Sequence, residues 1–146
     1  MARINCENKN PRRPIDLSKV RKIADAALGR LYKRGEVEIN IVFVSNQKIR
    51  AMNRRYLGVD ASTDVLAFWQ DGPAREKRRF LGDIVISSDK AAMNAKEYNM
   101  SFAEEMALYI VHGILHLGGH DHRTKKSKTR MRELENGLLK NVRKFL

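Results

Sequence analysis

The sequence predicts a single α+β domain in which a small mixed sheet of four strands packs against about five helices. The chain has 146 residues, a length that suits one domain over residues 1–146, and no stretch long enough for a domain linker interrupts it. Short runs with strand-like alternation are interleaved with longer segments whose apolar residues recur at helical spacing. Apolar residues make up 42% of the chain and charged residues 32%, which favours a folded core over wholesale disorder.

The first half of the chain predicts two strands, each followed by a helix. Residues 3–7 alternate weakly and are expected to form a short strand. Asp16 can cap a helix over residues 17–31, where apolar side chains form one stripe. Residues 37–44 alternate as a half-buried strand does, and Ser45 can cap a second helix. The inward stripe expected for that second helix is Ile49, Met52 and Tyr56.

The second half predicts two strands and three helices. Strands are expected where short apolar runs lie between turns, at residues 65–69 and 80–87. A helix begins at Ser88, and Ser101 and Glu104 have the spacing of a capping box for the next one. That helix, residues 102–117, is apolar on nearly every side, which predicts a central position. A last helix, at about residues 127–146, has one apolar face and one strongly basic face.

All four histidines lie in one short stretch between His112 and His122. His112 and His116 are four residues apart on a predicted helix, so their rings project from the same face. The glycine pair at 118–119 ends the helix and lets His122 return toward the same point. Two imidazoles from a helix and one from the following loop form three corners of a tetrahedron. With water at the fourth corner, this is the pattern of an open catalytic zinc site.

The histidines also allow other interpretations. A single buried histidine is usually a hydrogen-bonded core residue, and His120 could supply a fourth ligand, which would make the site closed and structural. His120 and His122 would need a sharp bend to reach one ion together. We therefore expect an open site with one ion, zinc or another divalent transition metal.

The histidine spacing resembles the H-E-x-x-H motif of zinc proteases, with one difference. Gly113 stands where those enzymes carry the glutamate general base, so ordinary peptide hydrolysis would lack its proton acceptor. A small residue at this position is expected to leave room above the metal. Asp121, the nearest acid, is a candidate catalytic residue that can orient a ligand imidazole, with capping of the loop as the alternative.

Three blocks of the sequence together resemble one known family. The stretch HGILHLGGHDH at 112–122 resembles H-G-x-L-H-L-x-G-Y-D-H, and LGDI at 81–84 resembles L-G-D-I. NRRY at 53–56 followed by DASTDVLAF at 60–68 resembles N-x-x-Y-R…T-D-V-L-S-F. The order and spacing of these blocks, over about residues 36–146, are similar to those of the YbeY family.

The resemblance implies a zincin-like fold with the metal in a cleft. It also implies a metal-dependent endoribonuclease that cuts single-stranded RNA in ribosomal RNA maturation and ribosome quality control. Carried over by position, the family's metal ligands become His112, His116 and His122. Ribosomal RNA is then the expected partner, together with proteins of the ribosomal subunit.

The chain departs from the family pattern at three positions. His120 replaces a tyrosine and Ala67 replaces a serine. Leu57 stands where the family has an arginine that is thought to help catalysis. Arg54, three residues earlier on the same helical face, can reach the same space, whereas Arg55 points away. Arg54 is therefore a candidate catalytic residue, with a solvated surface arginine as the alternative.

The chain is strongly basic, with a net charge of +12 and a pI near 10.1, which favours polyanionic partners. The basic residues expected to contact phosphates lie in two clusters, Arg75, Lys77, Arg78 and Arg79, and Arg123, Lys125 and Lys126. A charge run of this kind is otherwise a solvated face. Aromatic residues are few, so no broad stacking platform is expected. Phe68 and Trp69 are interpreted as core or groove wall rather than as stacking partners.

Cys6 is the only cysteine, and no apolar stretch resembles a signal peptide or a membrane span, so the cytoplasm is expected. Three alternatives to the nuclease remain. Leu57 supports a non-catalytic RNA-binding assembly factor that keeps a metal for stability, and Gly113 argues against a metal-dependent peptide hydrolase. A membrane-surface role is weakest, because the core needs the apolar face of the last helix.

Overall fold

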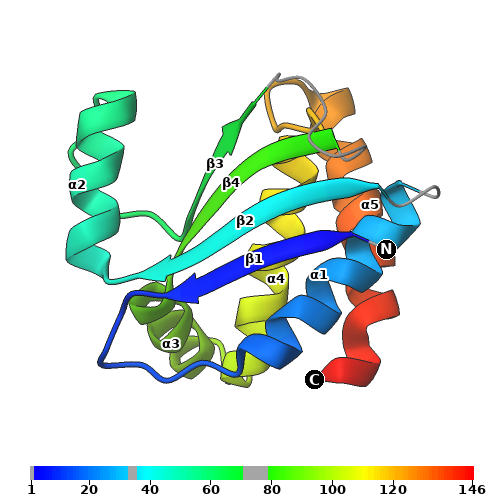
Figure 1. Ribbon diagram of the computed structural model, residues 1–146. Helices are drawn as coiled ribbons and strands as arrows, with labels where there is room; N and C mark the ends of the chain where they lie inside the picture. The colour runs from blue at the N-terminus through cyan, green and yellow to red at the C-terminus, as the bar shows by residue number, and fades with distance from the viewer. Residues whose placement is uncertain (1, 33–35, 71–78) are drawn as a thin grey trace.

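A four-stranded mixed sheet forms the centre of the computed structural model, which describes residues 2–32, 36–70 and 79–146 (Figure 1). The strand order is β1-β2-β4-β3. Strands β1 and β4 both run parallel to β2, and β3 runs antiparallel to β4 at the edge of the sheet. The strands are β1 (Arg3–Asn8), β2 (Val37–Val44), β3 (Val65–Trp69) and β4 (Arg79–Ser87). The predicted mixed sheet is therefore confirmed.

The described residues form five α-helices, as the sequence predicts, and a final short 3-10 helix. These are α1 (Leu17–Leu31), α2 (Asn46–Leu57), α3 (Ser88–Glu97), α4 (Phe102–Leu117), α5 (Lys125–Val142) and η1 (Arg143–Phe145). The predicted caps of α1, α2 and α4 form, including the capping box of α4. Helix α5 begins two residues earlier than predicted because Thr124 caps it with its hydroxyl oxygen, which accepts the Ser127 N–H.

Helices α1 and α4 pack against one face of the sheet, and α5 packs against both of these helices (Figure 1). Alternation on β2 turns its apolar residues toward these helices, and the main core forms between them. The position of α4 explains why it is apolar on nearly every side. No helix in the described part of the chain is both long and apolar enough to cross a membrane.

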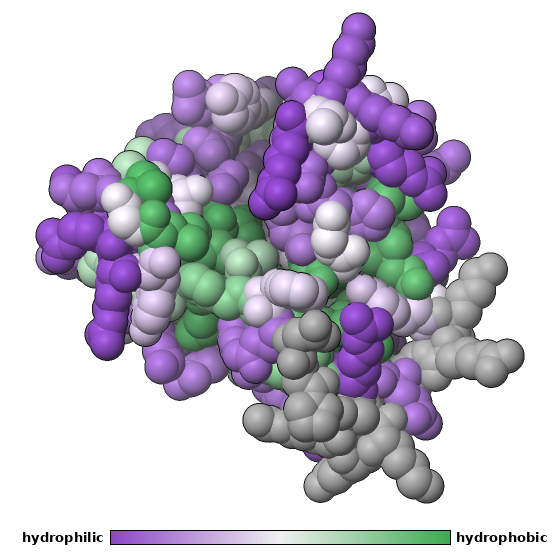
Figure 2. Space-filling model, turned by 90° about the horizontal axis from the view of Figure 1, so that it is seen from above, coloured by the Kyte–Doolittle hydropathy of each residue, from purple (hydrophilic) through white to green (hydrophobic). Residues whose placement is uncertain are grey.

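Helix α2 lies apart from the others and covers a smaller apolar cluster on the opposite face of the sheet. Its expected inward stripe is only partly correct. Ile49 is fully buried and Met52 is half-buried, but Tyr56 is exposed. Burial decreases along the helix because α2 diverges from the sheet, and the Tyr56 ring contacts Phe68 edge to face at 5.6 Å. Figure 2 shows apolar surface left of centre, on the side where α2 lies.

Candidate metal centre

Three histidine side chains meet where α4 ends and the following loop begins. His112 and His116 lie one turn apart on α4, with ring centroids 4.8 Å apart. The ring centroid of His122, after the turn at residues 118–119, lies 5.3 Å from that of His112 and 5.9 Å from that of His116. One nitrogen from each residue forms a set in which all members lie within 4.8 Å of one another. The structure therefore brings together the three histidines selected from the sequence.

The turn that returns His122 depends on a backbone conformation that glycine adopts readily. The Gly119 N–H donates to the carbonyl of His116, and the His120 N–H donates to that of Leu115, both at 3.0 Å. Gly119 has a φ of +88°, in the left-handed region. A side chain at this position would strain the turn and displace the loop that carries His122.

The donor set fits a divalent transition metal ion. Nitrogen ligands around tetrahedral zinc are about 3.3 Å apart, so small rotations of the rings close the cluster onto one ion. Burial lowers the pKa of His116 below its ordinary value, and His112 and His122 lower it further. These effects favour the neutral imidazole, which is the form that binds metal. Within the described residues, no fourth histidine, cysteine or carboxylate belongs to the cluster.

Glu135 on α5 contacts the imidazole of His112, one of the three histidines of the cluster. Its Oε2 atom lies 2.8 Å from Nδ1 of His112, and both side chains are partly buried. An ionised carboxylate only accepts, so this contact places the ring hydrogen on Nδ1 and leaves the Nε2 lone pair free. Glu135 was not among the site residues predicted from the sequence. The available signal was an acid four residues after Met131, beside the apolar stripe of a basic helix.

Asp121 holds the loop together in the structure. One carboxylate oxygen accepts the backbone N–H of Arg123 at 3.0 Å, and the other lies 3.7 Å from Nε of Arg123. The Arg123 N–H and the Ser127 hydroxyl lower the pKa of Asp121 below its usual range. These contacts agree with the loop-capping interpretation of Asp121 and place it one residue before His122.

Gly113 lets α4 pack closely against the sheet. The residue is buried, and a Cβ atom there would lie 2.7 Å from Cγ2 of Ile84 on β4. The helix can approach the sheet this closely only because position 113 has no side chain. A side chain at this position would therefore meet Ile84 on β4.

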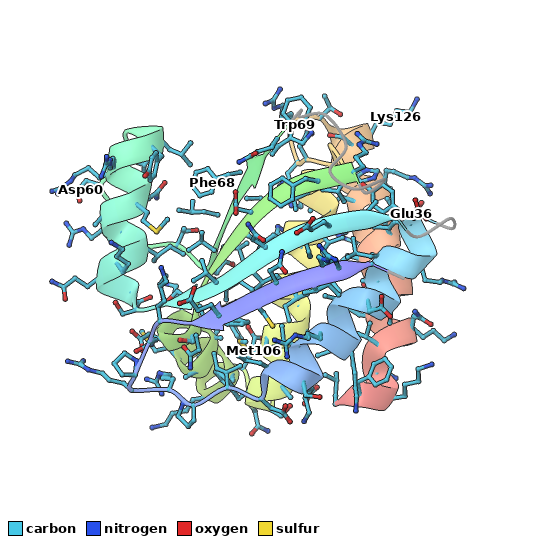
Figure 3. All side chains as sticks on the ribbon, in the orientation of Figure 1. Glu36, Asp60, Phe68, Trp69, Met106 and Lys126 are labelled. Carbon is cyan, nitrogen blue, oxygen red and sulfur yellow. The ribbon has the colours of Figure 1, made fainter. Side chains whose placement is uncertain are left out.

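Two other candidates, His120 and Arg54, lie outside the histidine cluster. His120 follows the helix-ending turn and is not part of the cluster. Arg54 lines a shallow depression on α2 together with Arg50 and Asp60. The labelled Asp60 lies on the side of α2 that faces away from the sheet (Figure 3). Leu57, which replaces the family arginine, is 59% exposed at the end of α2.

The basic residues beside the cluster are exposed. Arg123, Lys125 and Lys126 follow His122 directly, in the loop and the first turn of α5. Arg79 is exposed at the start of β4. The remaining members of the second basic cluster, Arg75, Lys77 and Arg78, lie outside the described residues.

Comparison with known proteins agrees with the resemblance seen in the motifs. Residues 4–143 match the family model described as endoribonuclease YbeY. Curated proteins named Endoribonuclease YbeY include one from Alkaliphilus oremlandii, 41% identical over 125 residues that cover 82% of each chain. Another, from Bacillus velezensis, is 34% identical over 131 residues that cover 84% of this chain and 83% of the relative.

The fold is also similar to a solved structure. The solution structure of TM1509 from Thermotoga maritima superimposes with a TM-score of 0.64 at 30% sequence identity, and the match covers 97% of this chain and 89% of that one. The family model spans nearly the whole chain, including the three histidines. The chain therefore belongs to the endoribonuclease YbeY family.

Proposed function

We propose that this chain is a metal-dependent endoribonuclease that cuts single-stranded RNA during ribosomal RNA maturation and quality control, with His112, His116 and His122 as metal ligands. The observation that carries the proposal is the convergence of three imidazole nitrogens at the end of α4, in a chain of an endoribonuclease family. The described part of the chain provides three ligands and no fourth. This donor number suits a catalytic site that keeps one position for water or substrate.

Zinc is the ion that we propose for the site. Three imidazoles are a common ligand set of catalytic zinc, although other divalent transition metals also accept imidazole. When bound, such an ion supplies Lewis acidity, which polarises a phosphoryl oxygen and activates water. Glu135 is proposed to position His112 by accepting the Nδ1 hydrogen at 2.8 Å.

The residues around the cluster are proposed to bind the phosphate backbone. Arg123, Lys125 and Lys126 are exposed beside His122, and their contacts with phosphates would give affinity with little sequence selectivity. Asp121 accepts the Arg123 N–H and so keeps this basic loop next to the ligand. Arg75, Lys77, Arg78 and Arg79 are proposed as a second set of phosphate contacts.

Arg54 is proposed as the arginine that stabilises negative charge building up on the reacting phosphate, in place of the arginine that Leu57 replaces. Its present neighbours are Arg50 and Asp60, and Asp60 already pairs with Arg50 at 2.9 Å. This pairing supports the availability of Arg54 for an RNA phosphate. We also propose that ribosomal RNA and proteins of the ribosomal subunit are the partners of this chain. The proposed location is the cytoplasm.

The test is an RNA cleavage assay with purified protein, paired with elemental analysis of the same sample. The proposal predicts one equivalent of metal and cleavage of single-stranded ribosomal RNA. Leu57, in place of the family arginine, favours a second candidate function, that of a non-catalytic assembly factor. That candidate predicts RNA that is bound but never cut, with binding unchanged in His116→Ala.

A further inference from the structure

Trp69 is a large exposed aromatic residue that the core does not use. It is the only tryptophan in the chain and the last residue of the edge strand β3. Its side chain is 61% exposed, so of the two interpretations from the sequence, core and groove wall, the core is wrong. Single exposed apolar residues are common and carry no meaning by themselves. The exposure of Trp69 becomes informative because this residue lies near the end of α4 that carries the histidines.

The side chain of Trp69 lies on the face of the sheet that carries α4. Side chains alternate along a strand, so Val65, Ala67 and Trp69 share one face. Val65 and Ala67 pack against the main core, which contains the buried residues of α4. Phe68 points the other way and packs with the smaller cluster under α2. Trp69 therefore continues the row that runs beside α4.

Trp69 also lies at the level where α4 ends. It pairs with Gly82 across the β3–β4 ladder. A Cβ atom on Gly82 would lie 2.9 Å from Cδ2 of Leu117, the last residue of α4. Leu117 directly follows His116, one of the three proposed ligands. The tryptophan is thus one strand away from the helix end that carries the histidine cluster.

Cationic side chains lie at the same end of the molecule. Figure 3 shows Trp69 and Lys126 both at the upper end of the view, and Lys126 lies in the first turn of α5, just after the loop that leaves α4. Arg123 in that loop has an 87% exposed side chain, and the chain as a whole carries a net charge of +12. Exposed aromatic surface beside cations is the combination that binds single-stranded nucleic acid, because bases stack while the cations contact phosphates.

We propose that Trp69 stacks on an unpaired base of the RNA substrate and so holds the strand beside the three-histidine cluster. The inference rests on the proposed nuclease function and names a residue that positions its substrate. Every base has a flat face, so this contact adds affinity with little preference for sequence. Trp69 touches no reacting atom in this account. Its loss is expected to raise KM for RNA while kcat changes little.

The experiment uses the fluorescence of Trp69, which is unambiguous because the chain has no other tryptophan. Metal-loaded protein is titrated with a short single-stranded 2′-O-methyl phosphorothioate oligonucleotide, which resists hydrolysis. We expect saturable quenching of the tryptophan emission. Binding measured by fluorescence anisotropy of a labelled oligonucleotide should weaken about 5- to 150-fold in Trp69→Ala, whereas Trp69→Phe should keep most of the affinity.

The matched control is Tyr98→Ala, because Tyr98 is 64% exposed at the end of α3 and lies far from α4's last turn (Figure 1). It should bind the oligonucleotide as the wild type does. All three variants change exposed side chains, so their melting temperatures should match that of the wild type.

Two results would overturn the inference while leaving the nuclease proposal intact. One is wild-type protein that binds and cuts RNA with no change in tryptophan emission on binding. The other is Trp69→Ala with wild-type affinity and KM. Emission that changes with protein concentration alone would assign Trp69 to contact with a second copy of the chain instead. Wild-type protein that neither binds nor cuts RNA would contradict the proposed function itself.

Discussion

The imidazole of His112 and the carboxylate of Glu135 lie 2.8 Å apart and connect α4 to α5 beside the histidine cluster. The two residues are 23 positions apart in the sequence. Their contact fixes which ring nitrogen of His112 carries the hydrogen and which is free to bind a cation. The last helix therefore contributes to the candidate metal centre as well as to the core.

Removal of Glu135 is expected to weaken metal binding while the fold persists. Glu135→Ala should lower zinc affinity about 10- to 100-fold, because His112 loses the acceptor that orients its ring. Glu135→Gln, whose amide oxygen can still accept, should lose less. Competition with a chromogenic chelator measures the affinity directly.

Glu133→Ala is the control for that measurement, since Glu133 is an exposed acid on the same helix, 3.7 Å from Arg130. It should bind zinc as the wild type does. Equal zinc affinity in Glu135→Ala and Glu133→Ala would remove the orienting role.

A methyl group at position 113 is expected to destabilise the fold. Gly113→Ala would place its Cβ atom 2.7 Å from Cγ2 of Ile84 and push α4 away from β4, at a cost of about 1–3 kcal/mol. Ile84→Val keeps Cγ1 and Cγ2 and removes only Cδ1, whereas Ile84→Ala removes all three atoms that approach the new methyl group. The double variant Gly113→Ala, Ile84→Ala should therefore be more stable than the sum of the single changes predicts. Urea denaturation of all four proteins measures this coupling, and simple additivity would contradict the packing explanation.

Local signals predicted most of the fold. The apolar spacing and capping box of α4, and the alternation of β2, depend on residues within one element. The histidine cluster was also predictable, because His112 and His116 are one helical turn apart and the glycine turn limits where the next residues can go. These features needed no knowledge of how distant segments pack.

The features that were missed depend on tertiary contacts. Glu135 reaches His112 only because α5 packs beside α4, and no spacing in the sequence reports that distance. Tyr56 has the helical position of an inward residue, but α2 diverges from the sheet before reaching it. No signal in the sequence indicated that Gly113 packs against Ile84, a residue on a distant strand.

Asp89 is expected to make stability depend on pH in the acid range. Burial acts to raise its pKa, but the Asn46 N–H, the Asn10 amide and the Arg13 guanidinium together hold the pKa below its usual range. The unfolded value is about 3.9, so the stabilisation is present above that pH and disappears as the pH falls through the lower folded value. Asp89→Asn should therefore cost about 2 kcal/mol at neutral pH and progressively less below about pH 4.

Thermal or urea unfolding of wild type and Asp89→Asn across this pH range provides the measurement. Asp60→Asn is the control, because Asp60 also pairs with an arginine but has a 56% exposed side chain, and it should change stability little. A difference between wild type and Asp89→Asn that stays constant down to low pH would contradict the electrostatic explanation.

Arg54 is expected to matter for cleavage more than its neighbour Arg55. Arg54→Ala should lower kcat about 100-fold or more if the guanidinium stabilises charge on the reacting phosphate. Arg55, whose guanidinium carbon lies 5.5 Å from the Tyr56 ring centroid, is the matched control. Steady-state cleavage of a labelled single-stranded RNA separates kcat from KM. Equal rates in the two variants would show that Arg54 is a solvated surface residue with no role in cleavage.

The most direct test of the three-histidine centre combines metal content with RNA cleavage in His116→Ala and His120→Ala. Both variants change one of two histidines four residues apart, and only His116 belongs to the cluster. We predict that wild type and His120→Ala each bind one equivalent of metal and cut single-stranded ribosomal RNA, and that chelation stops cleavage until zinc is restored. His116→Ala should lose both properties. Undiminished cleavage by metal-free wild type, or by His116→Ala, would contradict the account.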